Sequence, residues 1–84
     1  MAQVVYSATA LGHIERAQAV AAIQSAVDTL AAHPLIGRRV EGELRELVIS
    51  YGQTGYLALY RHVIARDEVR ILAIRHQREL GYLP

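Results

Sequence analysis

The chain of 84 residues contains neither cysteine nor lysine. Without cysteine it can form no disulfide bonds and no thiolate metal sites, which suits a reducing compartment such as the cytoplasm. No apolar run approaches the roughly 20 residues that cross a bilayer, and no basic region precedes an apolar one near the first residue. We therefore expect one cytoplasmic domain over residues 1–84, with no membrane partner and no signal peptide.

All nine cationic side chains are arginines, and the net charge is +1. A balance so close to neutral argues against a protein that coats nucleic acid. Arginine makes planar, bidentate contacts with phosphate and carboxylate groups and stacks on aromatic rings. A GC-rich genome, which favours arginine codons, explains the same bias without a function. Position is more informative than number, because six of the nine arginines lie from Arg45 onward.

The chain also lacks the common motifs of metal and nucleotide chemistry. Its four histidines are scattered and have no carboxylate at ligand spacing: His13, His33, His62 and His76. It has no glycine-rich phosphate loop and no nucleophile elbow. We therefore expect neither a metal nor a cofactor.

The N-terminal half carries one strand pattern followed by helical patterns. Residues 3–6 form a β-branched and aromatic run that predicts a short strand, and Ser7 after it can cap a helix. Helical patterns extend over residues 8–17 and 18–32, and the second carries an apolar stripe: Val20, Ile23, Val27 and Leu30. Because no turn residue separates the two segments, a short helical hairpin and one long helix both remain open.

The C-terminal half predicts consecutive strands. Residues 35–42 look like a connector, and strand patterns follow at 43–51, at 56–65 and from Asp67 onward, with turn signals between them. These patterns predict a three-stranded antiparallel meander, and the N-terminal strand can join one of its edges. The whole order predicts an α+β fold, with helices packed on one face of a three- to four-stranded antiparallel sheet.

The strand at residues 56–65 is apolar on both faces. Alternation places Leu57, Leu59 and Val63 on one face, and on the other Tyr56, Ala58, Tyr60 and Ile64. In the last strand it separates Val69, Ile71 and Ala73 from Arg70, Leu72 and Ile74. A single helical layer covers only one side, so we predict that the helices cover the leucine face and another chain covers the tyrosine face. Tyrosines that simply tolerate solvent are the alternative.

Polar and aromatic side chains gather where the apolar run of the last strand stops. The set, together with the facing strand, comprises Tyr60, Arg61, His62, Arg75, His76, Gln77, Arg78 and Tyr82. A histidine or tyrosine in it could serve as acid or base in phosphodiester cleavage while arginines hold the phosphate. The same residue types are enriched in protein-binding surfaces. Strand periodicity does not separate these two hypotheses.

Four pieces of the chain, in their order and spacing, resemble one protein family. They are Leu-Ala-Ala-His-Pro-Leu-Ile-Gly-Arg at 30–38, Arg-Glu-Leu-Val at 45–48, Gly-Tyr-Leu-Ala-Leu-Tyr-Arg at 55–61 and Val-Arg-Ile-Leu-Ala-Ile-Arg-His-Gln-Arg-Glu at 69–79. The family is the RelE/ParE superfamily of toxins from type II toxin–antitoxin modules. The resemblance implies a helical hairpin packed on an antiparallel sheet, although members usually have longer helices than the stretch from Ile14 to Ile23 allows.

The superfamily has two activities, and the residues are more similar to one of them. The RelE branch cleaves messenger RNA on the ribosome and relies on lysines and arginines, whereas this chain has no lysine and has Leu57 where that branch typically has an arginine. The pair Tyr60-Arg61 and the ending at residues 74–78 resemble the ParE branch, which inhibits DNA gyrase and is regarded as lacking nuclease activity. This resemblance implies a non-enzymatic toxin that causes growth arrest and stabilises plasmids. The implied target-binding residues are Arg61, Arg75, His76, Arg78 and Tyr82.

The resemblance also implies partners. A small, neighbour-encoded antitoxin would neutralise the toxin in a hetero-oligomer, and operator DNA would be bound only through the antitoxin. The predicted antitoxin-binding residues are Tyr56, Tyr60, Ile64, Leu72 and Ile74. The alternative is a RelE-like ribonuclease acting on the ribosome and mRNA, with catalytic Arg78, His76 and Tyr82. A third hypothesis is an inactive relative that only binds its antitoxin.

Overall fold

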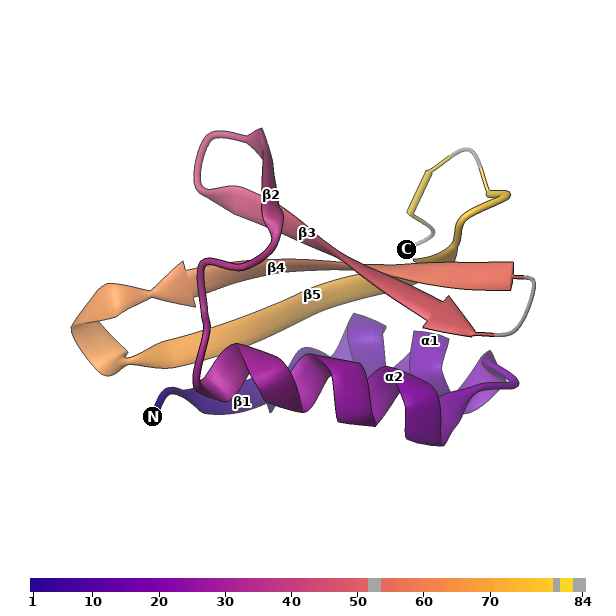
Figure 1. Ribbon diagram of the computed structural model, residues 1–84, viewed down its shortest axis with the longest axis horizontal. Helices are drawn as coiled ribbons and strands as arrows, with labels where there is room; N and C mark the ends of the chain where they lie inside the picture. The colour runs from indigo at the N-terminus through magenta and orange to yellow at the C-terminus, as the bar shows by residue number, and fades with distance from the viewer. Residues whose placement is uncertain (52–53, 80, 83–84) are drawn as a thin grey trace.

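The computed structural model describes residues 1–51, 54–79 and 81–82. Within these residues the chain forms a sheet with two helices on one side (Figure 1). The elements are β1 (Gln3–Tyr6), α1 (Ala8–Arg16), α2 (Val20–Asp28), the 3-10 helix η1 (Thr29–Ala31), β2 (Arg38–Glu41), β3 (Leu44–Tyr51), β4 (Thr54–Val63), the 3-10 helix η2 (Ile64–Arg66) and β5 (Glu68–His76). None of the helices in these ranges combines the length and apolarity needed to span a bilayer.

The sheet has five strands in the order β1-β5-β4-β3-β2. The predicted meander is confirmed, because β3, β4 and β5 pair antiparallel in sequence order. The N-terminal strand joins the edge of the meander as expected and lies parallel to β5. The fifth strand, β2, falls in the segment at residues 35–42 that the sequence predicts to be a connector. All four of its side chains are exposed, so this strand has no buried face. Its sequence, Arg-Arg-Val-Glu, therefore shows no alternation between apolar and polar residues that would predict a strand.

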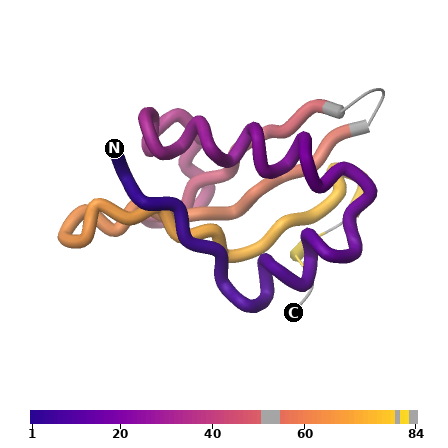
Figure 2. Tube along the Cα trace, turned by 90° about the horizontal axis from the view of Figure 1, so that it is seen from below, coloured from indigo at the N-terminus to yellow at the C-terminus, as the bar shows by residue number. Residues whose placement is uncertain are grey.

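The two helical segments form a hairpin rather than one long helix. The helical conformation stops after Arg16, because Ala17 has an extended backbone (φ −80°, ψ 149°), and it resumes at Val20. Both helices lie on the same side of the sheet (Figure 2). The break contains only alanine and glutamine at residues 17–19, which explains why no turn signal predicted it.

Ser7 fixes the start of α1 and ties it to the sheet. Its Oγ accepts a hydrogen bond from the Ala10 N–H at 3.0 Å and donates one to the Leu72 carbonyl at 2.9 Å. We expect Ser7→Ala to lower the free energy of unfolding by about 1–2 kcal/mol, because both bonds are lost. Urea denaturation measures this change. The control is Thr9→Ala, an exposed change in the same turn expected to cost less than about 0.5 kcal/mol; equal effects of the two variants would contradict the cap.

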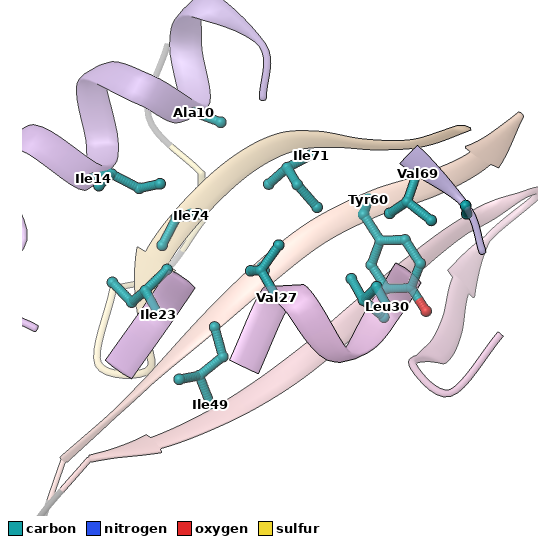
Figure 3. Packing of buried hydrophobic residues seen from close by; sticks show 12 residues of the cluster. Ala10, Ile14, Ile23, Val27, Leu30, Ile49, Tyr60, Val69, Ile71 and Ile74 are labelled. Atoms are coloured by element: carbon teal, nitrogen blue, oxygen red, sulfur yellow. The ribbon is translucent and has the colours of Figure 1, made fainter. Parts of the chain in front are cut away.

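The core lies between the helices and the tyrosine face of the sheet. The helices contribute Ile23, Val27 and Leu30, all fully buried. The sheet contributes Tyr60 and Ile71, also fully buried, and Figure 3 shows these side chains packed between the two layers. The prediction that the helices cover the leucine face is therefore wrong. The tyrosine can be buried because its hydroxyl accepts a hydrogen bond from the Gly37 N–H at 2.8 Å.

A bulge in β5 changes which residues face the helices. Leu59 pairs with Ala73 but Tyr60 pairs with Ile71, so Leu72 is an extra residue without a register partner. As a result Ile74 joins Ile71 in the core, while Ala73 lies on the other face with Leu59. The predicted grouping of Ala73 with Ile71 is wrong for this reason, since strict alternation assumes an unbroken ladder.

The face that the helices leave uncovered, which we call the open face, carries the outward side chains of β3, β4 and β5. Register and alternation place Val48, Leu57 and Arg75 in one row across it, and Glu46, Leu59 and Ala73 in the next. The described residues after β5, 77–79 and 81–82, lie on this side of the sheet (Figure 1), where Tyr82 contacts Glu46. Leu57 is only 6% exposed even though it faces away from the helices. The open face is therefore partly covered by the chain itself.

Candidate interaction site on the open face

Glu46 is the buried centre of a polar cluster on the open face, with 5% exposure. Arg38, its register partner on β2, donates hydrogen bonds from Nε and Nη2 to Oε1 at 3.2 and 2.7 Å. Tyr82 donates its hydroxyl to Oε2 at 2.7 Å. Arg75 Nη2 lies 3.9 Å from the same oxygen, and the guanidinium carbon lies 5.2 Å from the centroid of the Tyr82 ring. We call these four residues the Glu46 cluster.

The electrostatics of the Glu46 cluster set the protonation of its two acids. Burial by itself raises the pKa of Glu46, but hydrogen bonds from Arg38 and Tyr82, with the charges of Arg38 and Arg75, outweigh it, and the pKa is lowered. Burial, followed by the hydrogen bond to Glu46 and the charge of that carboxylate, raises the pKa of Tyr82. Glu46 is therefore an anion and Tyr82 a protonated donor at neutral pH.

The structure brings together two of the predicted target-binding residues and separates the others. Arg75 and Tyr82 meet in the Glu46 cluster. Arg61 is exposed on the same face, next to Arg70, but lies four residues further along β4 than Leu57, the register partner of Arg75, roughly 13 Å away at the usual rise of a strand. Arg61 and Arg75 thus form two separate cationic points on the open face rather than one site.

His76 is the last residue of β5, and Arg78 lies in the turn that follows it. The His76 ring packs edge-on to Tyr56 at a centroid distance of 5.3 Å, on the side of the sheet that the helices cover. Its Nδ1 accepts a hydrogen bond from the Arg78 N–H at 3.1 Å, and its own N–H donates to Glu79 Oε1 at 3.0 Å. The Arg78 side chain is exposed. The three residues predicted to be catalytic in a ribonuclease, His76, Arg78 and Tyr82, are therefore divided between the turn and the Glu46 cluster.

The predicted antitoxin-binding set needs correction because it assumes that the tyrosine face is uncovered. Tyr60 and Ile74 are 0% and 4% exposed in the core beneath the helices, so a partner cannot reach them. Tyr56 is half-buried and packs against the same core. Ile64 in η2 is 80% exposed, and Leu72 at the bulge is half-buried. Only these last two stay available to a partner as predicted.

The sequence reasoning assigned no role to Glu46 or Arg38. The one signal for Glu46 is an acid next to the apolar run Leu47-Val48-Ile49, and the register places it with the side chains of the open face. Arg38 gave no signal, because its role depends on β2 pairing with β3. Across the described part of the chain, no group of three or more His, Cys, Asp or Glu side chains is placed to hold a metal ion.

The chain is similar to toxins of known modules. A family model described as "ParE toxin of type II toxin-antitoxin system, parDE" matches residues 3–81. The protein named Toxin RelE3 of Caulobacter vibrioides is 40% identical over 62 residues, which cover 74% of this chain and 65%, less than two thirds, of that protein.

The fold has a counterpart among solved structures. A chain of the intact E. coli RelBE toxin–antitoxin complex superimposes with a TM-score of 0.77 over 94% of this chain and 100% of that one. The identity is 11%, so this likeness concerns the fold alone. Two helices on a mostly antiparallel sheet are thus an arrangement that both chains share. The match over nearly the whole length shows that the chain belongs to the family of ParE toxins of type II toxin–antitoxin systems, within the RelE/ParE superfamily.

Proposed function

We propose that the chain is a ParE-like toxin that inhibits DNA gyrase by binding it as a protein, without catalysis of its own. The observation that carries this choice is the state of Tyr82, the C-terminal tyrosine that a ribonuclease would need for acid–base chemistry. Its hydroxyl is bound to Glu46 and its pKa is raised, so it is a poor general base at neutral pH. The absence of lysine and the apolar Leu57 beside Arg75 on the open face support the same choice.

The exposed cations would contact the target. Arg61 on the open face and Arg78 at the turn are both solvent-exposed. Arginine and tyrosine are enriched at the energetic centres of protein interfaces, and the positive charge of arginine steers association with an acidic surface. Arg75 and Tyr82 would act through the Glu46 cluster, which holds the C-terminal segment against the sheet.

A neighbour-encoded antitoxin would neutralise the toxin by covering the part of the open face that the chain leaves exposed. Val48 is 53% exposed there and Leu59 is half-buried, so an apolar segment has surface to bury. Ile64 and Leu72 would extend this contact. The complex would be a hetero-oligomer that reaches operator DNA only through the antitoxin.

The test is a gyrase supercoiling assay with the purified chain in a concentration series, with and without the neighbour-encoded partner. We expect inhibition that the partner relieves. Arg78→Gln should raise the concentration for half inhibition about tenfold, because one charged contact is lost. The matched control is Arg66→Gln, an exposed arginine in η2 expected to leave inhibition unchanged. A folded chain that never inhibits gyrase would refute the proposal.

The second candidate is a RelE-like, ribosome-dependent mRNA endoribonuclease, and it is favoured by the name of the 40% identical relative, Toxin RelE3. His76 and Arg78 would then act at the turn after β5, with Tyr82 released from Glu46. Cleavage of mRNA on ribosomes, lost in Arg78→Gln, is the result that would replace the gyrase proposal. An inactive relative would fail both assays and still bind its antitoxin.

A further inference from the structure

A pocket of about 300 Å³ lies beside α1 on the helix side of the sheet and shares only Arg75 with the Glu46 cluster. Its wall is formed by the last turn of α1, the segment that leads into α2, and the adjoining ends of β4 and β5. The residues that give it polar chemistry are His13, Arg16, Arg75, His76 and Glu79, and Tyr56 supplies an aromatic wall. None of the roles discussed above uses His13 or Arg16.

His13 lines this pocket and carries a hydrogen-bond donor that has no partner in the described part of the chain. The residue is 8% exposed, and its Nδ1 accepts a hydrogen bond from the Ile74 N–H at 2.9 Å. A ring that accepts at Nδ1 carries its proton on Nε2. Nε2 is buried and has no partner among the described residues. A buried donor without an acceptor costs about 1–3 kcal/mol, so an acceptor brought by a ligand would recover free energy here.

Two further residues with hydrogen-bond donors line the same pocket. His76 accepts from the Arg78 N–H at Nδ1, so its proton also lies on Nε2. Arg16 is exposed at the end of α1 and has no hydrogen-bonding or ion-pair partner in the part of the chain that the structure describes. A guanidinium and two imidazole N–H groups around one pocket make a site for an acceptor that carries negative charge.

The charge around the pocket favours a single negative charge. Arg16 has no partner among the described residues, whereas Arg75 donates from Nη1 to the carbonyl of Glu79 and lies near Glu46. Glu79 also lines the pocket, and its negative charge would repel a doubly charged phosphate more than a carboxylate. The wall of Tyr56 and Ile74 suits the apolar stem of an acidic side chain.

We propose that this pocket binds a carboxylate of a protein partner, held by Arg16 and by the Nε2–H groups of His13 and His76. The partner is the antitoxin or gyrase, so the source of the carboxylate rests on the proposed function. The existence of the carboxylate site does not depend on the proposed function, because the site is a property of the free chain.

The first test uses acetate as the probe and the imidazole nitrogens as the readout. The full chain, labelled with ¹⁵N, is titrated with sodium acetate at constant ionic strength and neutral pH. We expect saturable shifts at His13 and His76 with a Kd on the order of 10 mM. His33 and His62 do not line the pocket and should not respond. An absent response, or the same response to sodium chloride, overturns the proposal; tighter binding of inorganic phosphate overturns the choice of a carboxylate.

Substitutions at the pocket test whether acetate binds at the proposed residues. Arg16→Gln, an exposed change, should weaken acetate binding about fivefold or more, and Arg66→Gln should leave it unchanged. His13→Asn retains an acceptor for the Ile74 N–H but removes the Nε2 donor, so it should also weaken the His76 response. If His13→Asn does not fold, Arg16→Gln still decides. Normal acetate binding by Arg16→Gln would overturn the assignment.

A second experiment, with the complete antitoxin and gyrase, identifies which of the two supplies the carboxylate. Arg16→Gln and Arg66→Gln are compared for affinity to the neighbour-encoded antitoxin and for gyrase inhibition. We expect a loss of about fivefold or more in one of the two assays, and that assay names the source. If Arg16→Gln changes neither assay but loses acetate binding, the ligand of the pocket is not a carboxylate of the antitoxin or of gyrase, and the proposal is overturned. Failure to inhibit gyrase would refute the proposed function and leave the acetate result intact.

Discussion

Replacement of Tyr60 by alanine is expected to lower the free energy of unfolding by about 3–5 kcal/mol. Tyr60 is fully buried at the centre of the sheet, between β3 and β5, and its ring packs against the core under the helices. The substitution also leaves the Gly37 N–H without its acceptor. The variant therefore combines the free-energy cost of a cavity with that of an unpaired buried donor.

Two other variants separate these contributions. Tyr60→Phe keeps the ring and removes only the hydroxyl, so we expect a loss of about 1–2 kcal/mol. Leu59→Ala is the matched control, because Leu59 is the preceding residue on the open face and is only half-buried; its loss should be about 1 kcal/mol. Urea denaturation of the three variants gives the comparison. A larger loss for Leu59→Ala than for Tyr60→Ala would mean that the helices cover the opposite face.

Glu46→Gln is expected to lower the free energy of unfolding by about 2 kcal/mol at neutral pH. The carboxylate accepts three hydrogen bonds from Arg38 and Tyr82, and the amide cannot replace its charge. The Arg38 side chain is 67% exposed, which keeps the expected loss well below that for a fully buried pair.

The effect of Glu46→Gln should also depend on pH. Because the pKa of Glu46 is lowered in the folded state, its contribution is fully present above the unfolded value of about 4.3 and is lost as pH falls through the folded value. The difference between the natural chain and the variant should therefore shrink below about pH 4. Denaturation at pH 7 and pH 3 measures it, with the exposed Glu43→Gln as control. A difference that grows in acid would contradict the lowered pKa.

The strands and helices could largely be predicted because their signals are local. Apolar spacing predicted the helical stripe of Ile23, Val27 and Leu30, and alternation predicted the three strands of the meander. The choice between the two faces could not be predicted from periodicity, since both faces of β4 are apolar. It depends on a donor 23 residues away in the chain, the Gly37 N–H that lets Tyr60 be buried.

The candidate site was predicted in part. Arg75 and Tyr82 stand out because they follow or end an apolar strand, and the structure places them together. Their anchor, Glu46, could not be predicted, because its importance comes from the pairing of β2 with β3 and from the return of the C-terminal segment. The sequence indicates which individual side chains could form a site, but it does not indicate which residues far apart in the chain come into contact.

The position of β5 in the sheet has a consequence for synthesis. Strand β5 is made after β1 and β4 but lies between them in the sheet, so the residues of β1 pair with residues 68–71, far along the chain. Until residues 68–76 emerge, β1 has no strand to pair with and α1 lacks the surface on which Ala10 and Ile14 are buried. Such long-range pairing is slow and leaves apolar surface exposed in incomplete chains. The sheet of a nascent copy therefore stays incomplete until residues 68–76 have emerged.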